Sequence, residues 1–190
     1  MENSVSYPTY TVPNHILDRF PKASRSIWSN AEEKDWNNWI WQQQQRVRNL
    51  EMLEKVVKVT DDERRAYDGS VEMFNMSITP YYAALMDPED PNCPIRLQAV
   101  PKGGELKINP EDMEDPLAEE RDMPVPGVTH RYPDRVLFYT THNCAMYCRF
   151  CTRKRKVSDP GSAAQKKQLD DALEYIRNHS KIRDVVIPGG

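Results

Sequence analysis

The sequence predicts an α/β fold in which a parallel sheet follows a helical region. Residues 135–141 (RVLFYTT) are rich in β-branched and aromatic side chains, and residues 184–187 (DVVI) form a second short apolar run, so each is expected to be a strand. Between them, apolar residues recur every three or four positions over residues 163–179, which predicts an amphipathic helix. A strand, a helix and a second strand in this order form a βαβ unit with parallel strands.

Two capping boxes predict the helical region. The segment SNAE beginning at Ser29 precedes apolar residues at helical spacing, so we expect one helix over residues 30–57. The segment TDDE beginning at Thr60 predicts a second helix that runs to about residue 76. The Thr79-Pro80 pair ends this pattern, and we expect a short helix to follow it, over residues 81–86.

Composition divides the chain into four parts. Nine of its 15 prolines lie in residues 88–134, and because each proline lacks a backbone donor, we expect no long regular element there. The predicted parts are an irregular arm (1–28), a helical N-terminal region (29–87), a Pro-rich wrapping connector (88–134) and the start of the α/β part (135–190).

Charge and hydrophobicity exclude several classes of protein. A net charge of -3 gives no general attraction to nucleic acid. No apolar run approaches the roughly 20 residues that a membrane-spanning helix needs, and the N-terminus lacks the features of a secretory signal. Three of the four cysteines lie within eight positions, which favours metal ligation in a reducing cytoplasm over a disulfide framework.

The three clustered cysteines carry the main chemical signal. Cys144, Cys148 and Cys151 have the spacing C-x3-C-x2-C and follow the first predicted strand, at the edge of a parallel sheet where active sites form. Three thiolates can hold three irons of a [4Fe–4S] cubane and leave the fourth iron open, whereas an electron carrier uses four protein ligands. An open iron can bind a small molecule and pass it an electron.

Two other metal sites compete with this interpretation. A zinc site needs about four ligands, so it would recruit His142 or His130 beside the cysteines, but only one C-x2-C pair is present. A ferredoxin-like cluster would need a fourth cysteine at suitable spacing. Cys93 lies far upstream in the Pro-rich part, and we interpret it as an ordinary cysteine.

The cysteine spacing, with the aromatic Phe150 before the last cysteine, resembles the radical S-adenosylmethionine (SAM) superfamily. The resemblance implies that the open iron binds SAM and that the bound SAM yields an adenosyl radical. It further implies that Phe150 lies against the SAM adenine. Gly189 and Gly190, after the second predicted strand, resemble the glycine motif that contacts the SAM amino group, where glycine allows close backbone approach.

Longer segments resemble one family within that superfamily, the lysine 2,3-aminomutases. The most specific is THRYPDR at residues 129–135, and the resemblance covers residues 30–190. It implies the beginning of a partial (β/α) barrel preceded by an N-terminal helical region. It also implies the migration of an amino group from C2 to C3 of an amino acid, with a [4Fe–4S] cluster, SAM and pyridoxal 5′-phosphate (PLP) as cofactors.

The same resemblance assigns roles to four further residues. Arg131, Tyr132 and Arg135 would bind the PLP phosphate, because arginine forks suit a phosphate dianion. Arg153 would bind the substrate α-carboxylate. We interpret the basic run that follows, residues 154–156, as a solvated loop.

Substrate and assembly are expected from the family alone. Phe150 stands where lysine aminomutases usually carry histidine, which favours the glutamate branch, so lysine and glutamate both remain candidate substrates. We expect a flavodoxin- or ferredoxin-type reductant, a cytoplasmic location and a homo-oligomer at full length, with Trp36, Trp39 and Trp41 as possible interface residues.

The length of the chain suggests a fragment. Only 56 residues follow residue 134, whereas a complete (β/α)8 barrel needs about 250 residues. The family's PLP-anchoring lysine has no counterpart here, so we expect the 190 residues alone to be inactive. Two alternative functions remain: an aminomutase-like radical SAM enzyme with a different outcome, and a non-catalytic module that binds iron–sulfur or zinc.

Overall fold

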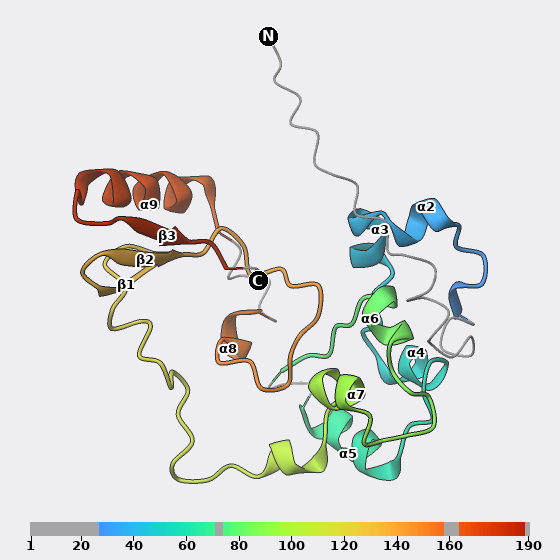
Figure 1. The fold of residues 1–190 in the computed structure, drawn as a ribbon. Helices are drawn as coiled ribbons and strands as arrows, with labels where there is room; N and C mark the ends of the chain where they lie inside the picture. The colour runs from blue at the N-terminus through green and yellow to red at the C-terminus, as the bar shows by residue number, and fades with distance from the viewer. Residues whose placement is uncertain (1–26, 71–73, 158–163, 189–190) are drawn as a thin grey trace.

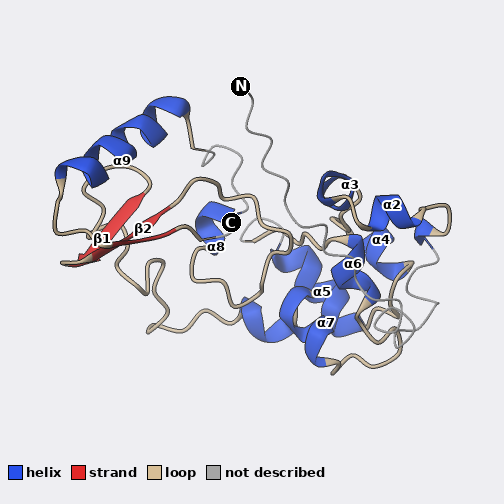
Figure 2. Cartoon of the chain, turned by 45° about the horizontal axis from the view of Figure 1, so that its top comes forward, coloured by secondary structure: helices blue, strands red, loops and turns tan. Residues whose placement is uncertain are grey.

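The computed structural model describes residues 27–70, 74–157 and 164–188 (Figure 1). A helical part, containing α2 to α7, lies beside a smaller part in which α9 covers a sheet. Figure 2 shows the same division, with the strands confined to one side and α8 lying toward the helical part. Most of the predicted N-terminal arm and the predicted SAM-binding Gly189 and Gly190 lie outside the described residues.

Three short helices replace the single long helix predicted over residues 30–57, so that prediction was wrong. They are α2 (Glu33–Trp36), α3 (Trp39–Gln44) and α4 (Leu50–Glu54).

Two asparagines explain the breaks between these helices. The Asn38 side chain accepts a hydrogen bond from the backbone N–H of Ile40 at 2.9 Å, and Asn49 does the same for Met52 at 2.9 Å. Asparagine side chains satisfy the free N–H groups of a first turn and are poor residues for a helix interior. The periodic apolar residues therefore belong to successive helices that share one core.

The second capping box is confirmed. The Thr60 backbone N–H donates to Glu63 Oε2 at 2.8 Å, and the Glu63 N–H donates to Thr60 Oγ1 at 3.2 Å. This pair begins α5 (Asp61–Ser70), which is shorter than predicted. The expected short helix is α6 (Pro80–Ala84), which begins at the proline itself because the first turn of a helix needs no N–H from that residue.

The Pro-rich segment contains only short elements, as predicted. They are α7 (Pro94–Ala99) and the 3₁₀ helix η2 (Gly103–Leu106), followed near its end by the strand β1 (Val128–Tyr132). The sequence did not predict β1.

The predicted βαβ unit is confirmed. Strand β2 (Arg135–Phe138) pairs in parallel with β3 (Asp184–Val186), and α9 (Lys166–Asn178) connects them. The sheet has the order β1-β2-β3. Strand β1, which precedes β2 in the chain, pairs antiparallel with it in a hairpin. The fold is thus a mixed α/β arrangement, and a barrel is not formed by the strands of the described residues.

Each part has its own hydrophobic core. Val47, Leu53 and Ile78 belong to the core of the helical part. Val136 of β2 and Ala172 of α9 belong to the second core, between the sheet and the helix. Across the described ranges, no helix is long and apolar enough to cross a membrane.

The loop between β2 and α8 (Lys154–Val157) contains all three clustered cysteines and contacts the helical part. Ile78 pairs with Val47 on one side and with Met146 of this loop on the other. The Tyr147 N–H donates to the Ser77 carbonyl oxygen at 2.9 Å. The cysteine loop, residues 139–153, is therefore held against the helical part by backbone hydrogen bonds.

Candidate functional site

The three thiols of the cysteine loop are half-buried. Burial raises the pKa of the Cys144 thiol, and the charges of Cys151 and Cys148 raise it further. Burial and Cys151 likewise raise the pKa of Cys148. The loop therefore carries the three donors that the spacing predicts, close enough for their charges to act on Cys144 and Cys148.

These donors suit an iron–sulfur cluster in kind and number, because thiolates are its usual protein ligands. Within the described residues, however, no three His, Cys, Asp or Glu side chains are already arranged around a point that could hold a metal ion. Among these residues, His142 and His130, one of which a zinc site would need, are likewise not arranged with the cysteines around a common point. Cys93 is buried and its Sγ accepts a hydrogen bond from the Asp87 N–H at 3.4 Å, which is consistent with an ordinary structural cysteine.

Arg46 holds the beginning of the cysteine loop. Its Nη1 donates to Asn143 Oδ1 and to the Cys144 carbonyl oxygen, both at 3.2 Å. Its guanidinium also lies 5.9 Å from the centre of the Tyr147 ring, within the range of a cation–π contact.

Arg149 holds the end of the loop, and its side chain is only 5% exposed. Its Nη2 donates to Glu105 Oε2 at 2.8 Å, its Nε donates to both Glu105 oxygens, and its Nη1 donates to the Phe74 carbonyl oxygen at 3.2 Å. A buried guanidinium with all its nitrogens engaged fixes the backbone between Cys148 and Cys151.

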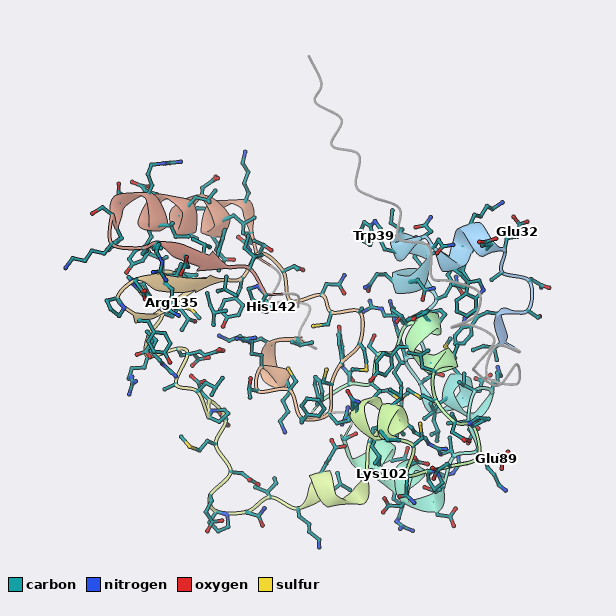
Figure 3. The ribbon with its side chains drawn as sticks, in the orientation of Figure 1. Glu32, Trp39, Glu89, Lys102, Arg135 and His142 are labelled. Atoms are coloured by element: carbon teal, nitrogen blue, oxygen red, sulfur yellow. The ribbon has the colours of Figure 1, made fainter. Side chains whose placement is uncertain are left out.

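A cavity of about 260 Å³ opens beside the sheet. It is lined by all four residues to which the family resemblance assigned anion binding, namely Arg131, Tyr132, Arg135 and Arg153. Figure 3 shows Arg135 on the sheet and His142 farther along the chain, at the beginning of the cysteine loop.

The cavity connects to the cysteines through Arg153. The Arg153 backbone N–H donates to Cys151 Sγ at 3.4 Å, while its side chain lines the cavity. Phe150, predicted to contact the SAM adenine, is 70% exposed and is therefore accessible to a ligand.

Each cavity arginine has a carboxylate partner. Arg131 Nε donates to Asp122 Oδ2 at 2.8 Å, and Arg135 Nε donates to Asp134 Oδ1 at 2.9 Å. Hydrogen bonds from Arg121 and Arg131 hold the pKa of Asp122 below its usual value.

Arg153 is held most closely. Its Nη2 donates to Glu119 Oε1 at 2.8 Å and its Nε donates to the Tyr139 hydroxyl oxygen at 3.0 Å. Burial is the largest single influence and would lower the pKa of Arg153, but the hydrogen bonds and charges of Glu119 and Tyr139 together outweigh burial and raise the pKa.

The basic run after the cysteines is only partly a solvated loop. Lys154 is exposed, as predicted, but Lys156 is half-buried and lies 3.6 Å from a Glu120 oxygen. Lys156 and His142 line a second cavity of about 290 Å³. The side chain of Arg155 lies outside the described residues.

No protein-family model matches the chain. Comparison with known proteins nevertheless finds several relatives, all of which are named as 2,3-aminomutases. The chain is 50% identical over 164 residues to the L-lysine 2,3-aminomutase of Bacillus subtilis, covering 86% of this chain and 35% of that protein. It is 44% identical to the L-lysine 2,3-aminomutase of Clostridium subterminale, covering 86% and 39%. It is 39% identical over 161 residues to the glutamate 2,3-aminomutase of Clostridioides difficile, covering 85% and 38%.

This chain is a homologue of the lysine and glutamate 2,3-aminomutases. It spans less than two fifths of the length of these three relatives. Because the match to the Bacillus subtilis protein covers 164 of the 190 residues, it includes the cysteine loop and Arg131, Tyr132, Arg135 and Arg153 of the cavity.

Sequence reasoning did not find two residues of this aminomutase homologue that organise its site. Glu119 and Arg149 resemble ordinary charged residues of a polar segment, and their partners lie 34 and 44 positions away. The only signal available was the position of Arg149 between two cysteines, which could have suggested that its side chain supports the loop.

Proposed function

We propose that this chain forms the N-terminal part of a radical SAM, PLP-dependent amino acid 2,3-aminomutase, an isomerase that converts an α-amino acid into a β-amino acid. The observation that carries the proposal is the shared cavity. Residues assigned separately to phosphate binding and to carboxylate binding line one space of about 260 Å³. That space adjoins the cysteine loop through the Arg153 N–H, which donates to Cys151 Sγ.

Cys144, Cys148 and Cys151 would hold the [4Fe–4S] cluster. When bound, the cluster and SAM supply the radical that removes a hydrogen atom from the substrate, chemistry that side chains alone cannot perform. The half-buried position of the thiols limits access of water, and Arg46 and Arg149 keep the loop in place. Phe150, Gly189 and Gly190 would contact SAM.

Arg131, Tyr132 and Arg135 would bind the phosphate of PLP. Two guanidinium groups from one hairpin can contact different oxygens of a dianion. Arg153 would bind the α-carboxylate of the amino acid, which fixes the α-carbon between the phosphate site and the cysteine loop. A fixed orientation of this kind is a major contribution of a protein to rate.

The proposed substrate is a small α-amino acid of the lysine or glutamate type, since relatives named for both are similar to the chain. A flavodoxin- or ferredoxin-type reductant would supply the electron in the cytoplasm. A homo-oligomer is also proposed. Trp39 is 73% exposed and is available for an interface, whereas Trp36 packs within the chain against Trp28 and Trp41.

The decisive experiment uses the protein expressed at the full length of its gene and reconstituted anaerobically with iron and sulfide. We expect about four irons per chain by elemental analysis, SAM cleavage on reduction, and a β-amino acid from L-lysine or L-glutamate by mass spectrometry. Alanine at Cys144, Cys148 or Cys151 should abolish iron binding and SAM cleavage, and alanine at Cys93 should abolish neither.

Two results would count against the proposal. Zinc in place of iron, with no SAM cleavage, would support a non-catalytic module. SAM cleavage without a β-amino acid product would support a radical SAM enzyme of another outcome. The 190-residue chain by itself is expected to yield no β-amino acid.

A further inference from the structure

Glu119 is a buried carboxylate at the wall of the cavity, and its side chain is only 6% exposed. Both its oxygens face Arg153: Nε lies 3.2 Å from Oε1 and 3.0 Å from Oε2, and Nη2 lies 2.8 Å from Oε1. A charge so far out of water is stable only when it is paired.

The guanidinium of Arg153 has two edges that can each bind a carboxylate. Glu119 occupies the edge formed by Nε and Nη2. Nη1 donates no hydrogen bond to an acceptor among the residues that the structure describes. The edge formed by Nη1 and Nη2 is thus left for a second carboxylate. Glu119 consequently does not compete with a ligand for that edge.

Tyr139 fixes the plane of the same guanidinium. Its hydroxyl oxygen accepts a hydrogen bond from Arg153 Nε at 3.0 Å, and its ring centre lies 4.8 Å from Arg153 Cζ. A planar group held by an ion pair along one edge and by an aromatic ring on one face retains little rotational freedom.

The other cavity arginines are held less firmly. The side chains of Arg131 and Arg135 are 36% and 49% exposed, against 20% for Arg153, so solvent screens their ion pairs. Arg149, which lies outside the cavity, is held firmly but has no edge left open, because its Nε, Nη1 and Nη2 all donate to protein acceptors. Arg153 combines a firm hold with one edge left open.

We propose that Glu119 is a positioning residue, which holds Arg153 by one edge so that the other edge meets the α-carboxylate of the amino acid. This inference rests on the proposed function, because it assumes that Arg153 binds that carboxylate. Loss of the Glu119 charge would allow the arginine to rotate, and binding would lose the preorganised part of its free energy.

The test compares amino acids with their decarboxylated counterparts. Calorimetry measures the binding of L-lysine, 1,5-diaminopentane, L-glutamate and 4-aminobutanoate to the PLP-loaded full-length protein. Glu119→Gln should weaken the binding of whichever amino acid the wild type binds by about tenfold, the loss of roughly one charged hydrogen bond. It should leave the binding of the decarboxylated partner unchanged.

Glu120→Gln is the matched control, since it makes the same substitution at the exposed neighbouring position and should change neither affinity. Should Glu119→Gln fail to fold, Tyr139→Phe is the second variant, because it removes the hydroxyl that accepts the Arg153 Nε hydrogen bond and keeps the aromatic ring. It should then weaken amino acid binding about threefold, again with no effect on the decarboxylated compound.

The outcomes distinguish the positioning role of Glu119 from the binding role of Arg153. If Arg153→Lys weakens amino acid binding and Glu119→Gln does not, the positioning role is wrong and the proposed function stands. Equal losses for the amino acid and its decarboxylated counterpart in Glu119→Gln would show a general structural role and would also overturn the inference. If Arg153→Lys has no effect, the carboxylate site itself is wrong, and the inference fails with it.

Discussion

Glu63 is a fully buried carboxylate whose partners keep it charged. Arg96 Nη2 lies 2.6 Å from Oε2 and Lys102 Nζ lies 3.1 Å from Oε1, while the Thr60 N–H donates to Oε2. Burial by itself would raise the pKa of Glu63, but the hydrogen bonds from Arg96 and Thr60 outweigh burial and hold the pKa below its usual value. One side chain thus caps α5 and joins it to α7.

Replacing Glu63 with glutamine should destabilise the chain by about 3 kcal/mol, because Arg96 would remain buried without its counter-charge. Urea unfolding at pH 7 measures the change. Glu51→Gln removes an exposed ion pair with Lys55 and should leave the free energy of unfolding almost unchanged. A loss no larger than that of the control would contradict the structural role of the buried pair.

The same carboxylate makes stability depend on pH. Since the pKa of Glu63 is lower in the folded chain than in the unfolded chain, its contribution is complete above about pH 4.5 and is lost as the pH falls further. We expect wild-type stability to fall more steeply on acidification than that of Glu63→Gln. If the free energies of unfolding of the two proteins fall in parallel between about pH 6 and about pH 3, another carboxylate is responsible for the loss.

Arg149 should control the order of the cysteine loop. Arg149→Ala removes the partner of Glu105, which is 28% exposed and can be partly hydrated, so we expect a loss of about 2 kcal/mol. The freed loop should also expose its thiols, so Cys148 should react faster with a thiol reagent. Arg177→Ala, an exposed change on α9, is the control and should alter neither property.

At the scale of elements, the asparagine caps decide where the N-terminal helices begin. Asn49→Ala leaves the Met52 N–H without its acceptor and should cost about 1 kcal/mol in the free energy of unfolding. Gln44→Ala, at the exposed end of α3, should change stability little. Equal effects of the two substitutions on the unfolding curve would mean that the cap contributes nothing specific.

Elements with a strong local signal could be predicted from the sequence. The Thr60–Glu63 box and the helical period of α9 depend only on neighbouring residues, and both are present in the structure. Strand β1 could not be predicted, because its five residues are largely polar and follow a Pro-rich segment. Its pairing with β2 supplies the stability that its own composition does not.

At the scale of the whole molecule, Ile78 connects the two parts. Its side chain is fully buried in the helical core, and its backbone pairs with Val47 and Met146. Ile78→Ala should cost about 3 kcal/mol through the cavity it leaves, and it should also speed the labelling of Cys144. Leu173→Ala, at a residue 48% exposed on α9, is the control. Destabilisation without faster labelling would show that the core and the loop are independent.

The candidate site was predictable only where a motif specifies it. Arg131, Tyr132, Arg135 and Arg153 lie within two short motifs, and the structure brings all four to one cavity. Glu119 carries no such mark, since its role depends on a partner 34 residues later. Long-range pairs of charged residues arise from the tertiary fold, and spacing along one sequence does not reveal them.

The hairpin and the cysteine loop differ in how far along the chain their contacts extend. Tyr132 and Arg135 are paired across β1 and β2, three positions apart, whereas Arg149 reaches Phe74 across 75 positions and Arg46 reaches Cys144 across 98. Closing a long loop costs more entropy than closing a short one, so the hairpin should form before the cysteine loop docks. During synthesis, Arg131 and Arg135 would be in place in the hairpin while the thiols of the cysteine loop are still exposed.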